Sequence, residues 1–211
     1  MLVVAPYAVT MPLAFVVSER FDPRTSAGLV ALMLAPGALV APAVVNAAGG
    51  RRADMAGALL LGTAVLSFVL VAFGPGGITL ALTGAQAFAV AALVAGALPT
   101  VRDRVLLPLR WAGHVAGLAV MLLAAASGPR VDVATVAAAL AAVALLLGVA
   151  GAAALILRRD LFSALAATGT RDPVVATALA WSTGGVDATG VPLASAVILG
   201  IVAAALVIRR R

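Results

Sequence analysis

The sequence predicts an all-α, polytopic membrane protein with about eight transmembrane helices, two of them broken. Hydrophobic residues make up 64% of its 211 residues, charged residues only 10%, and the mean hydropathy is +1.19. A soluble domain carries about 25% charged residues. So few charges cannot cover a water-facing surface, and lipid must therefore contact most of the molecule. Two of the apolar segments are also interrupted by proline and glycine, which predicts the breaks.

The apolar segments have the length of membrane-spanning helices, which need about 20 residues. The connections between them are too short for a soluble domain, so the chain is predicted to be one transmembrane domain, 1–211. The expected spans are 1–18, 27–48, 55–73, 78–99, 105–126 and 133–157, followed by a composite segment, 173–208. The intervening residues, 158–171 among them, are expected to be connections.

The composite segment can be one span or two, because its centre, Ser182–Pro192, contains three glycines and a proline. With eight spans, eleven of the fourteen arginines lie on one side and only Arg20, Arg24 and Arg130 on the other. Seven spans would weaken this split to eight against six. The positive-inside rule therefore favours eight spans in the inner membrane, with both termini cytoplasmic.

Span 27–48 is interrupted by Pro36-Gly37 and by Pro42, and carries Asn46. A proline removes a backbone donor and clashes with the preceding turn. The sequence is compatible with an unwound stretch near the membrane midplane and with a simple kinked helix.

Ser182–Pro192 is the second predicted break, and it contains Asp187. A carboxylate inside the membrane marks an ion, proton or substrate path by default. The alternative places Asp187 in the solvated outer turn of a hairpin. Both placements are open from the sequence.

The two breaks fall in the middle span of the first three and of the last three spans. Broken segments at corresponding places in two halves are typical of the binding site of an inverted-repeat secondary transporter. In this hypothesis glycines permit unwinding, Asn46, Thr183 and Thr189 supply polar contacts, and Asp187 is the coupling carboxylate. The candidate substrate- or ion-binding residues are Pro36, Gly37, Pro42, Asn46, Ser182, Thr183, Gly184, Gly185, Asp187 and Thr189.

Several segments also resemble a known family. An apolar run ends in Met11-Pro12-Leu13-Ala14, Ala27–Val30 leads into Ala35-Pro36-Gly37, and the spacing continues through Gly50, Ala53 and Thr63 to Leu107-Pro108-Leu109. In bile acid:sodium symporters the first of these segments resembles the third helix, the second the run into the Cys-Pro-Gly-Gly motif, and the last the start of the seventh helix. The resemblance implies two inverted five-helix repeats and a chain that begins at the third helix, lacking the first two. Residues 1–75 and 133–208 would then be core-repeat helices and 78–126 panel-like helices.

The chain departs from this family at its sodium ligands. The Ser-Asn pair of the first crossing motif falls on Ala41 and Pro42, and the second motif, Glu-x-Gly-x-Gln-Asn, aligns with Ser182–Asp187 or Thr183–Ala188. A conventional two-sodium site is therefore not expected. Coupling, if there is any, would use a proton at Asp187 or one weaker cation site.

The leading hypothesis is thus a secondary active transporter that moves a small organic anion or amphipathic solute by alternating access. The alternative is a truncated or degenerate homologue that does not transport and has a structural or regulatory role. An enzyme is not expected, because the chain has no cysteine, one histidine and no visible catalytic or metal-binding cluster. Aromatic residues make up 4%, which argues against nucleic-acid binding. The predicted partners are the solute and the lipid bilayer, with a homo-oligomer left open and no cofactor beyond Na⁺ or H⁺.

Overall fold

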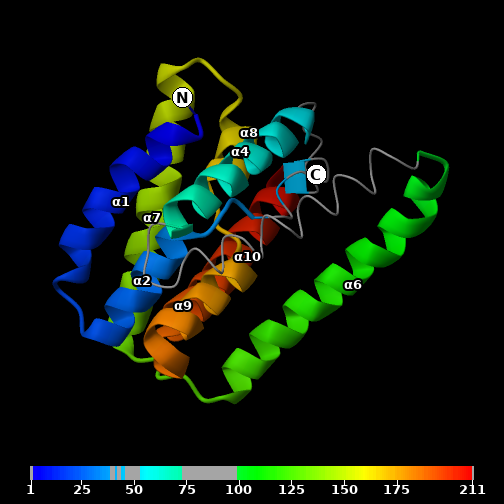
Figure 1. The fold of residues 1–211 in the computed structure, drawn as a ribbon. Coiled ribbons are helices and arrows are strands. Elements are labelled where there is room, and N and C mark those ends of the chain that lie inside the picture. Colours follow the sequence, from blue (N-terminus) through cyan, green and yellow to red (C-terminus); the bar gives the residue numbers. More distant parts are fainter. Residues whose placement is uncertain (1, 39–40, 42–43, 46–52, 73–98, 211) are drawn as a thin grey trace.

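The described part of the chain is helical, apart from one isolated antiparallel bridge between Gly37 and Arg171. The computed structural model describes all residues except 1, 39–40, 42–43, 46–52, 73–98 and 211 (Figure 1). Its elements are α1 (Val4–Ser18), α2 (Pro23–Leu34), α4 (Ala53–Ala72), α6 (Pro99–Ala126), α7 (Val133–Ile156), α8 (Leu161–Ala164), the π-helical turn η1 (Leu165–Gly169), α9 (Pro173–Ala188) and α10 (Gly190–Arg210).

Aspartate side chains begin four of these helices. Each carboxylate accepts hydrogen bonds from backbone N–H groups that have no partner inside the helix. Asp22 and Asp172 are each followed by a proline, which suits the first helical position. Asp132 and Asp160 cap α7 and α8 through the amides of Thr135 and Ser163, both at 2.8 Å. Half of the eight acidic residues of the sequence therefore act as helix caps.

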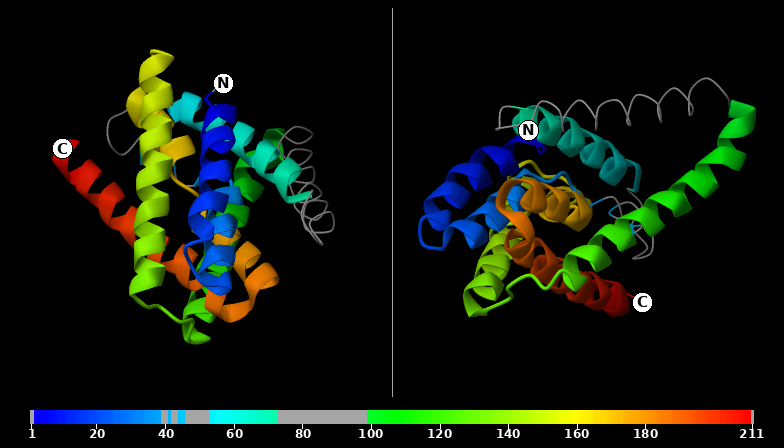
Figure 2. Two further views of the ribbon diagram at one scale, coloured as in Figure 1. Left: turned by 90° about the vertical axis from the view of Figure 1, so that its left-hand side faces the viewer. Right: turned by 60° about the horizontal axis from the view of Figure 1, so that its bottom comes forward.

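Helix α2 lies at the centre of the molecule, in contact with α1, α7, α9 and α10 (Figures 1 and 2). Its residues Leu29, Leu32 and Met33 are fully buried and form the main core cluster with Leu146 of α7. Helix α6 packs mainly against α9 and otherwise extends away from the bundle (Figure 1). It leaves a row of large apolar side chains exposed, as expected for a surface in lipid: Trp111, Val115, Leu118, Leu122 and Leu123.

Small residues bring α2 and α9 together. A Cβ atom on Gly28 would lie 2.2 Å from the carbonyl oxygen of Ala188, and one on Gly184 would lie 2.8 Å from the Cβ of Ala27. Such close backbone approach is typical of helices packed within membranes. The glycine at 184 therefore serves helix packing.

Two of the described helices are long and apolar enough to cross a membrane, Met55–Ala72 and Val133–Ile156. They match the expected spans 55–73 and 133–157. The pair Pro173–Ala188 and Gly190–Ala205 adds a third candidate, and the two members are bent by 112°. Shorter apolar helices cover Val4–Ser18 and Trp111–Ala126. The expected span 78–99 lies almost entirely outside the described residues.

The C-terminal third differs from the sequence-based expectation in two ways. The expected connection 158–171 contains helical structure, α8 and η1, because Asp160 caps a new helix there. The break expected over Ser182–Pro192 is confined to Gly185, with φ of 75°, and to the turn at Thr189 before α10. The other residues of Ser182–Pro192 are helical.

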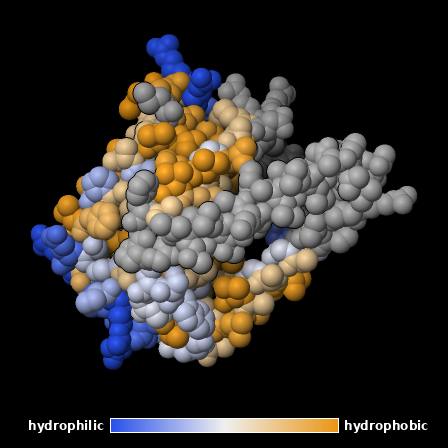
Figure 3. Space-filling model, viewed as in Figure 1, coloured by the Kyte–Doolittle hydropathy of each residue, from blue (hydrophilic) through white to orange (hydrophobic). Residues whose placement is uncertain are grey.

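Hydrophilic residues lie at two ends of the molecule, with hydrophobic residues between them (Figure 3). The α1–α2 connection with Arg20 and the α6–α7 connection with Arg130 lie at one end, and the α7–α8 connection with Arg158 and Arg159 lies at the other (Figure 1). This arrangement agrees with the predicted distribution of these four arginines.

Candidate functional site

Two extended segments from distant parts of the sequence cross at the centre of the molecule. Gly37 and Arg171 form an antiparallel bridge, and the amide of Asp172 donates to the carbonyl of Pro36 at 2.8 Å. The first segment follows the C-terminus of α2. The second connects the C-terminus of η1 with the N-terminus of α9. The ends of three helical elements therefore meet at this crossing.

Proline explains why both segments are extended. Ala35 and Asp172 each precede a proline, with ψ of 147° and 113°. The proline ring disfavours the helical conformation for the residue before it and favours an extended one. Pro36 also lacks the amide that would continue α2. The broken helix thus leaves backbone groups free to pair with a second segment.

Gly37 allows the two segments to touch. A Cβ atom at this position would lie 2.1 Å from the carbonyl oxygen of Ala167 and 2.9 Å from Oγ1 of Thr63. The Gly37 amide donates to Thr63 Oγ1 at 2.9 Å, and the hydroxyl of Ser67 donates to the carbonyl of Leu34 at 2.5 Å. Helix α4 therefore satisfies backbone groups that the break in α2 exposes. Gly37 serves close approach, and not only the unwinding that the sequence suggested.

Tyr7 of α1 also contacts the crossing, through its hydroxyl and its ring. Its hydroxyl donates to the carbonyl of Ala35 at 2.9 Å and contacts that of Thr63 at 3.3 Å. Cζ of Arg171 lies 4.0 Å from the centre of the Tyr7 ring, which is a cation–π contact. Both side chains are buried.

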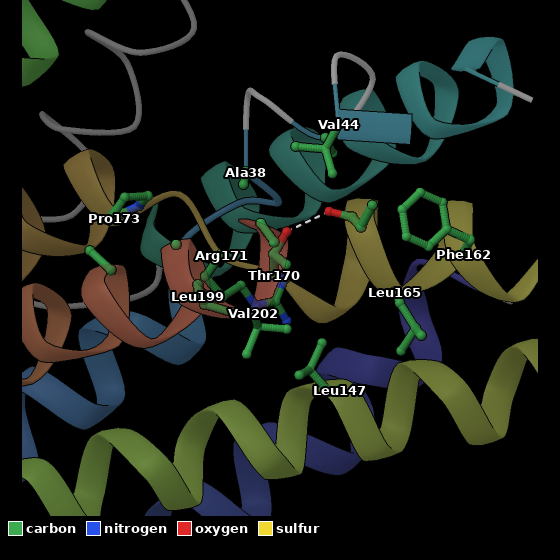
Figure 4. Close-up of a pocket in the computed structure, with 15 residues that line it drawn as sticks. Ala38, Val44, Leu147, Phe162, Leu165, Thr170, Arg171, Pro173, Leu199 and Val202 are labelled. Carbon is green, nitrogen blue, oxygen red and sulfur yellow. Dashed lines mark hydrogen bonds between the residues drawn. The ribbon is translucent and has the colours of Figure 1, made fainter. Parts of the chain in front are cut away.

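A cavity of about 370 Å³ lies against the crossing. In Figure 4 the Arg171 side chain extends between Thr170 and Val202, toward Leu147. The hydroxyl of Thr170 donates to the carbonyl of Ala166. Apart from Thr170 and Arg171, the described residues that line the cavity are apolar: Ala38, Ala41, Val44, Leu147, Phe162, Leu165, Ala166, Pro173, Ala196, Leu199, Gly200, Val202 and Ala203.

The sequence-predicted site residues divide into separate groups. Pro36 and Gly37 lie at the crossing, whereas Pro42 and Asn46 lie outside the described residues. Ser182 and Thr183 donate to the carbonyl of Leu179, and Thr189 donates to that of Val186 at 2.6 Å. Pro36 and Gly37 thus pair with Arg171 and Asp172 and not with the stretch Ser182–Thr189.

Asp187 lies in the last turn of α9 and forms an ion pair with Arg24 in the first turn of α2. The side chains of Arg24 and Asp187 are 60% and 32% exposed. Gly190, which begins α10 just after this end of α9, packs close to the carbonyl of Arg130 in the α6–α7 connection. The structure therefore favours the outer-turn placement of Asp187 over the intramembrane one.

Sequence reasoning missed Tyr7, Thr63 and Arg171 as site residues. Asp172-Pro173 carried a usable signal, because Asp172, like Ala35 before Pro36, is favoured in an extended conformation by the proline that follows it. No local pattern connects Tyr7 or Thr63 with the crossing. Their roles depend on helices α1 and α4 packing beside it.

Within the described residues, no group of three or more His, Cys, Asp or Glu side chains could hold a metal ion. No protein-family model, no curated protein and no solved structure matches this chain.

Proposed function

We propose that the chain is a secondary active transporter of the bile acid:sodium symporter type, which moves a small organic anion or amphipathic solute by alternating access. The observation that carries the proposal is the antiparallel contact between Gly37 and Arg171. It joins two broken helical segments from the two halves of the sequence, as expected for an inverted-repeat transporter.

The order of the helices supports the same proposal. Helix α1 is followed by α2, which ends before the extended segment at Pro36-Gly37, and later by α4. Helix α7 is followed by α8–η1, the extended segment at Arg171 and α9, and then by α10. In the described residues each half thus has an extended segment between its first and last helices, which supports an inverted repeat.

The structure also suggests a new register for the second family motif. If the second extended segment carries Glu-x-Gly-x-Gln-Asn, the motif falls on Ala167–Asp172, with Gly169 at its glycine. Ala167 then replaces the glutamate, and Arg171 the glutamine. An alanine and a cationic side chain cannot bind sodium. Asp172 takes the place of the asparagine, but its carboxylate caps α9. With the other two side-chain ligands lost, the proposed transport is independent of sodium.

Uptake into proteoliposomes tests this function. The purified protein is reconstituted, and uptake of labelled octanoate and taurocholate is measured with sodium or choline outside, at equal and at unequal pH. We expect saturable uptake above that of protein-free liposomes, with the same rate in sodium and in choline. Folded protein that accumulates neither solute under any gradient would favour the non-transporting homologue.

Asp187→Asn separates the coupling hypotheses in the same assay. If Asp187 couples transport to protons, the variant loses the stimulation by a pH gradient. Because the carboxylate is paired with Arg24 in an exposed turn, we expect the variant to retain uptake. Loss of the pH-driven component with retained folding would restore Asp187 to the mechanism.

A further inference from the structure

The guanidinium of Arg171 is buried and lacks hydrogen-bond partners. The residue is 0% exposed, and Nε, Nη1 and Nη2 each lack an acceptor among the described residues. Arginine stays protonated in proteins, so burial cannot be relieved by loss of the proton. A buried charge with no partner costs several kcal/mol. A ligand that supplies an acceptor would therefore gain from binding here.

The surroundings compensate the charge only in part. The Tyr7 ring faces the guanidinium, and the C-terminal ends of α2 and η1 carry partial negative charge. The adjacent carboxylate, Asp172, accepts from the amides of Val174 and Val175 at 3.0 and 3.1 Å. It is therefore directed toward the start of its own helix, α9. None of these groups accepts a hydrogen bond from Arg171.

The cavity beside Arg171 defines the rest of the ligand. Its volume of about 370 Å³ lies at the small end of ligand pockets, which measure about 300–1,000 Å³. Leu147, Phe162 and Leu199 supply an apolar lining. Such a cavity favours an apolar body with one hydrogen-bonding head group.

We propose that this cavity binds a small monoanionic amphiphile, with one carboxylate-like head group on Arg171 and an apolar body against Leu147, Phe162 and Leu199. The inference rests on the proposed function, because it assigns a substrate class to the same crossing. Val202 of α10 lies beside Arg171 (Figure 4), and the guanidinium nitrogens are buried. Binding therefore requires a shift of α10 side chains.

Calorimetric titration of the protein in phosphatidylcholine nanodiscs tests the proposal. Octanoate is compared with octanol and octyltrimethylammonium, which have the same tail and a neutral or cationic head, and empty nanodiscs correct for partitioning. We expect octanoate to bind at least tenfold more tightly than the other two. Equal affinity for the three compounds would overturn the assignment of the head group.

Matched variants locate the site. Arg171→Met should weaken octanoate binding at least tenfold, and Arg171→Lys should restore part of the affinity. Leu147→Trp should fill the cavity and block binding. Arg130→Met changes an exposed arginine at one end of the molecule and should leave binding unchanged. Arg171→Met removes an uncompensated buried charge, so its melting temperature should equal or exceed that of the wild type. Undiminished octanoate binding by folded Arg171→Met would overturn the proposal.

The same head-group chemistry can come from solution or from a lipid. Nanodiscs that contain phosphatidylglycerol distinguish the two sources. A rise in melting temperature with this lipid that Arg171→Met abolishes, together with competition against octanoate, would identify a lipid in the same site. If octanoate does not bind and the lipid does not raise the melting temperature, the proposed binding site is contradicted.

Failure of the site and failure of transport are distinguishable. Octanoate binding that depends on Arg171, without uptake in proteoliposomes, would keep the site and contradict transport. Uptake that is unchanged in Arg171→Met would keep transport and contradict the site.

Discussion

The backbone of Gly37 pairs with that of Arg171, although 133 positions separate the two residues in the sequence. The pairing is possible because each segment lies next to a proline and is therefore extended. It places a glycine from the first half of the chain against a buried arginine from the second half. The crossing therefore depends on both halves of the chain.

Gly37→Ala is expected to destabilise the protein by about 1–3 kcal/mol or more. The new methyl group would lie 2.1 Å from the carbonyl oxygen of Ala167, so the two segments must separate. Chemical unfolding in dodecyl maltoside micelles measures the loss. Gly148→Ala is the matched control, because a Cβ there meets nothing within 4 Å. Alanine should be neutral or stabilising at that helical position, and an equal loss in both variants would contradict the close approach at Gly37.

Thr63→Val is expected to cost about 1–3 kcal/mol, because the buried amide of Gly37 loses the hydroxyl that accepts its hydrogen bond. The substitution keeps nearly the same shape. Thr183→Val serves as the comparison, since the Thr183 hydroxyl bonds only to carbonyls of its own helix. The unfolding midpoint of Thr63→Val should be clearly lower than that of Thr183→Val. Similar midpoints would argue against the bond between α4 and Gly37.

Tyr7→Phe is expected to cost about 1 kcal/mol, because the ring remains beside Arg171 while the hydrogen bond to Ala35 is lost. Tyr7→Leu removes the ring as well and should cost more. A double-mutant cycle of Tyr7→Leu with Arg171→Met isolates the cation–π contact, for which we expect a coupling of about 1–2 kcal/mol. A coupling near zero would show that the ring does not stabilise the guanidinium.

Acid should weaken the cap of α2. The hydroxyl and then the amide of Thr25 donate to the Asp22 carboxylate and lower its pKa. A carboxyl with a lowered folded-state pKa stabilises the fold above its unfolded pKa, about 3.9, and loses this contribution as the pH falls through the folded pKa. Below about pH 4 the wild type should therefore lose stability more steeply than Asp22→Asn, which keeps a capping oxygen. Melting temperatures of both proteins between pH 3 and 7 measure this difference. If the two melting temperatures fall in parallel as the pH is lowered, the Asp22 carboxylate does not stabilise α2 in this way.

Much of the helical organisation could be predicted from the sequence, because hydrophobic segments and aspartate caps are local features. The expected spans 55–73 and 133–157 agree with α4 and α7 to within a few residues. The interruption after Leu34 could also be predicted from the sequence, because Pro36-Gly37 follows closely. The break predicted over Ser182–Pro192 is present as the 112° bend between α9 and α10. The extended segment that meets Gly37 lies earlier in the chain, at Arg171, and the sequence analysis did not predict it. In the structure Gly184 packs against Ala27, Pro192 lies within the first turn of α10, and Asp172-Pro173 marks the end of the extended segment.

The sequence by itself determined that the chain is helical and apolar, and where several helices begin and end. Composition, proline positions and aspartate caps act on residues close in the chain, so they can be interpreted locally. Only the tertiary structure decided which extended segments meet, and that Arg171 is buried against Tyr7 without a hydrogen-bond acceptor among the described residues. An arginine between two apolar segments has the same local sequence whether it faces water or the interior. The packing of α1, α2 and α10 around Arg171 decides between these two environments, and that packing depends on contacts between residues far apart in the chain.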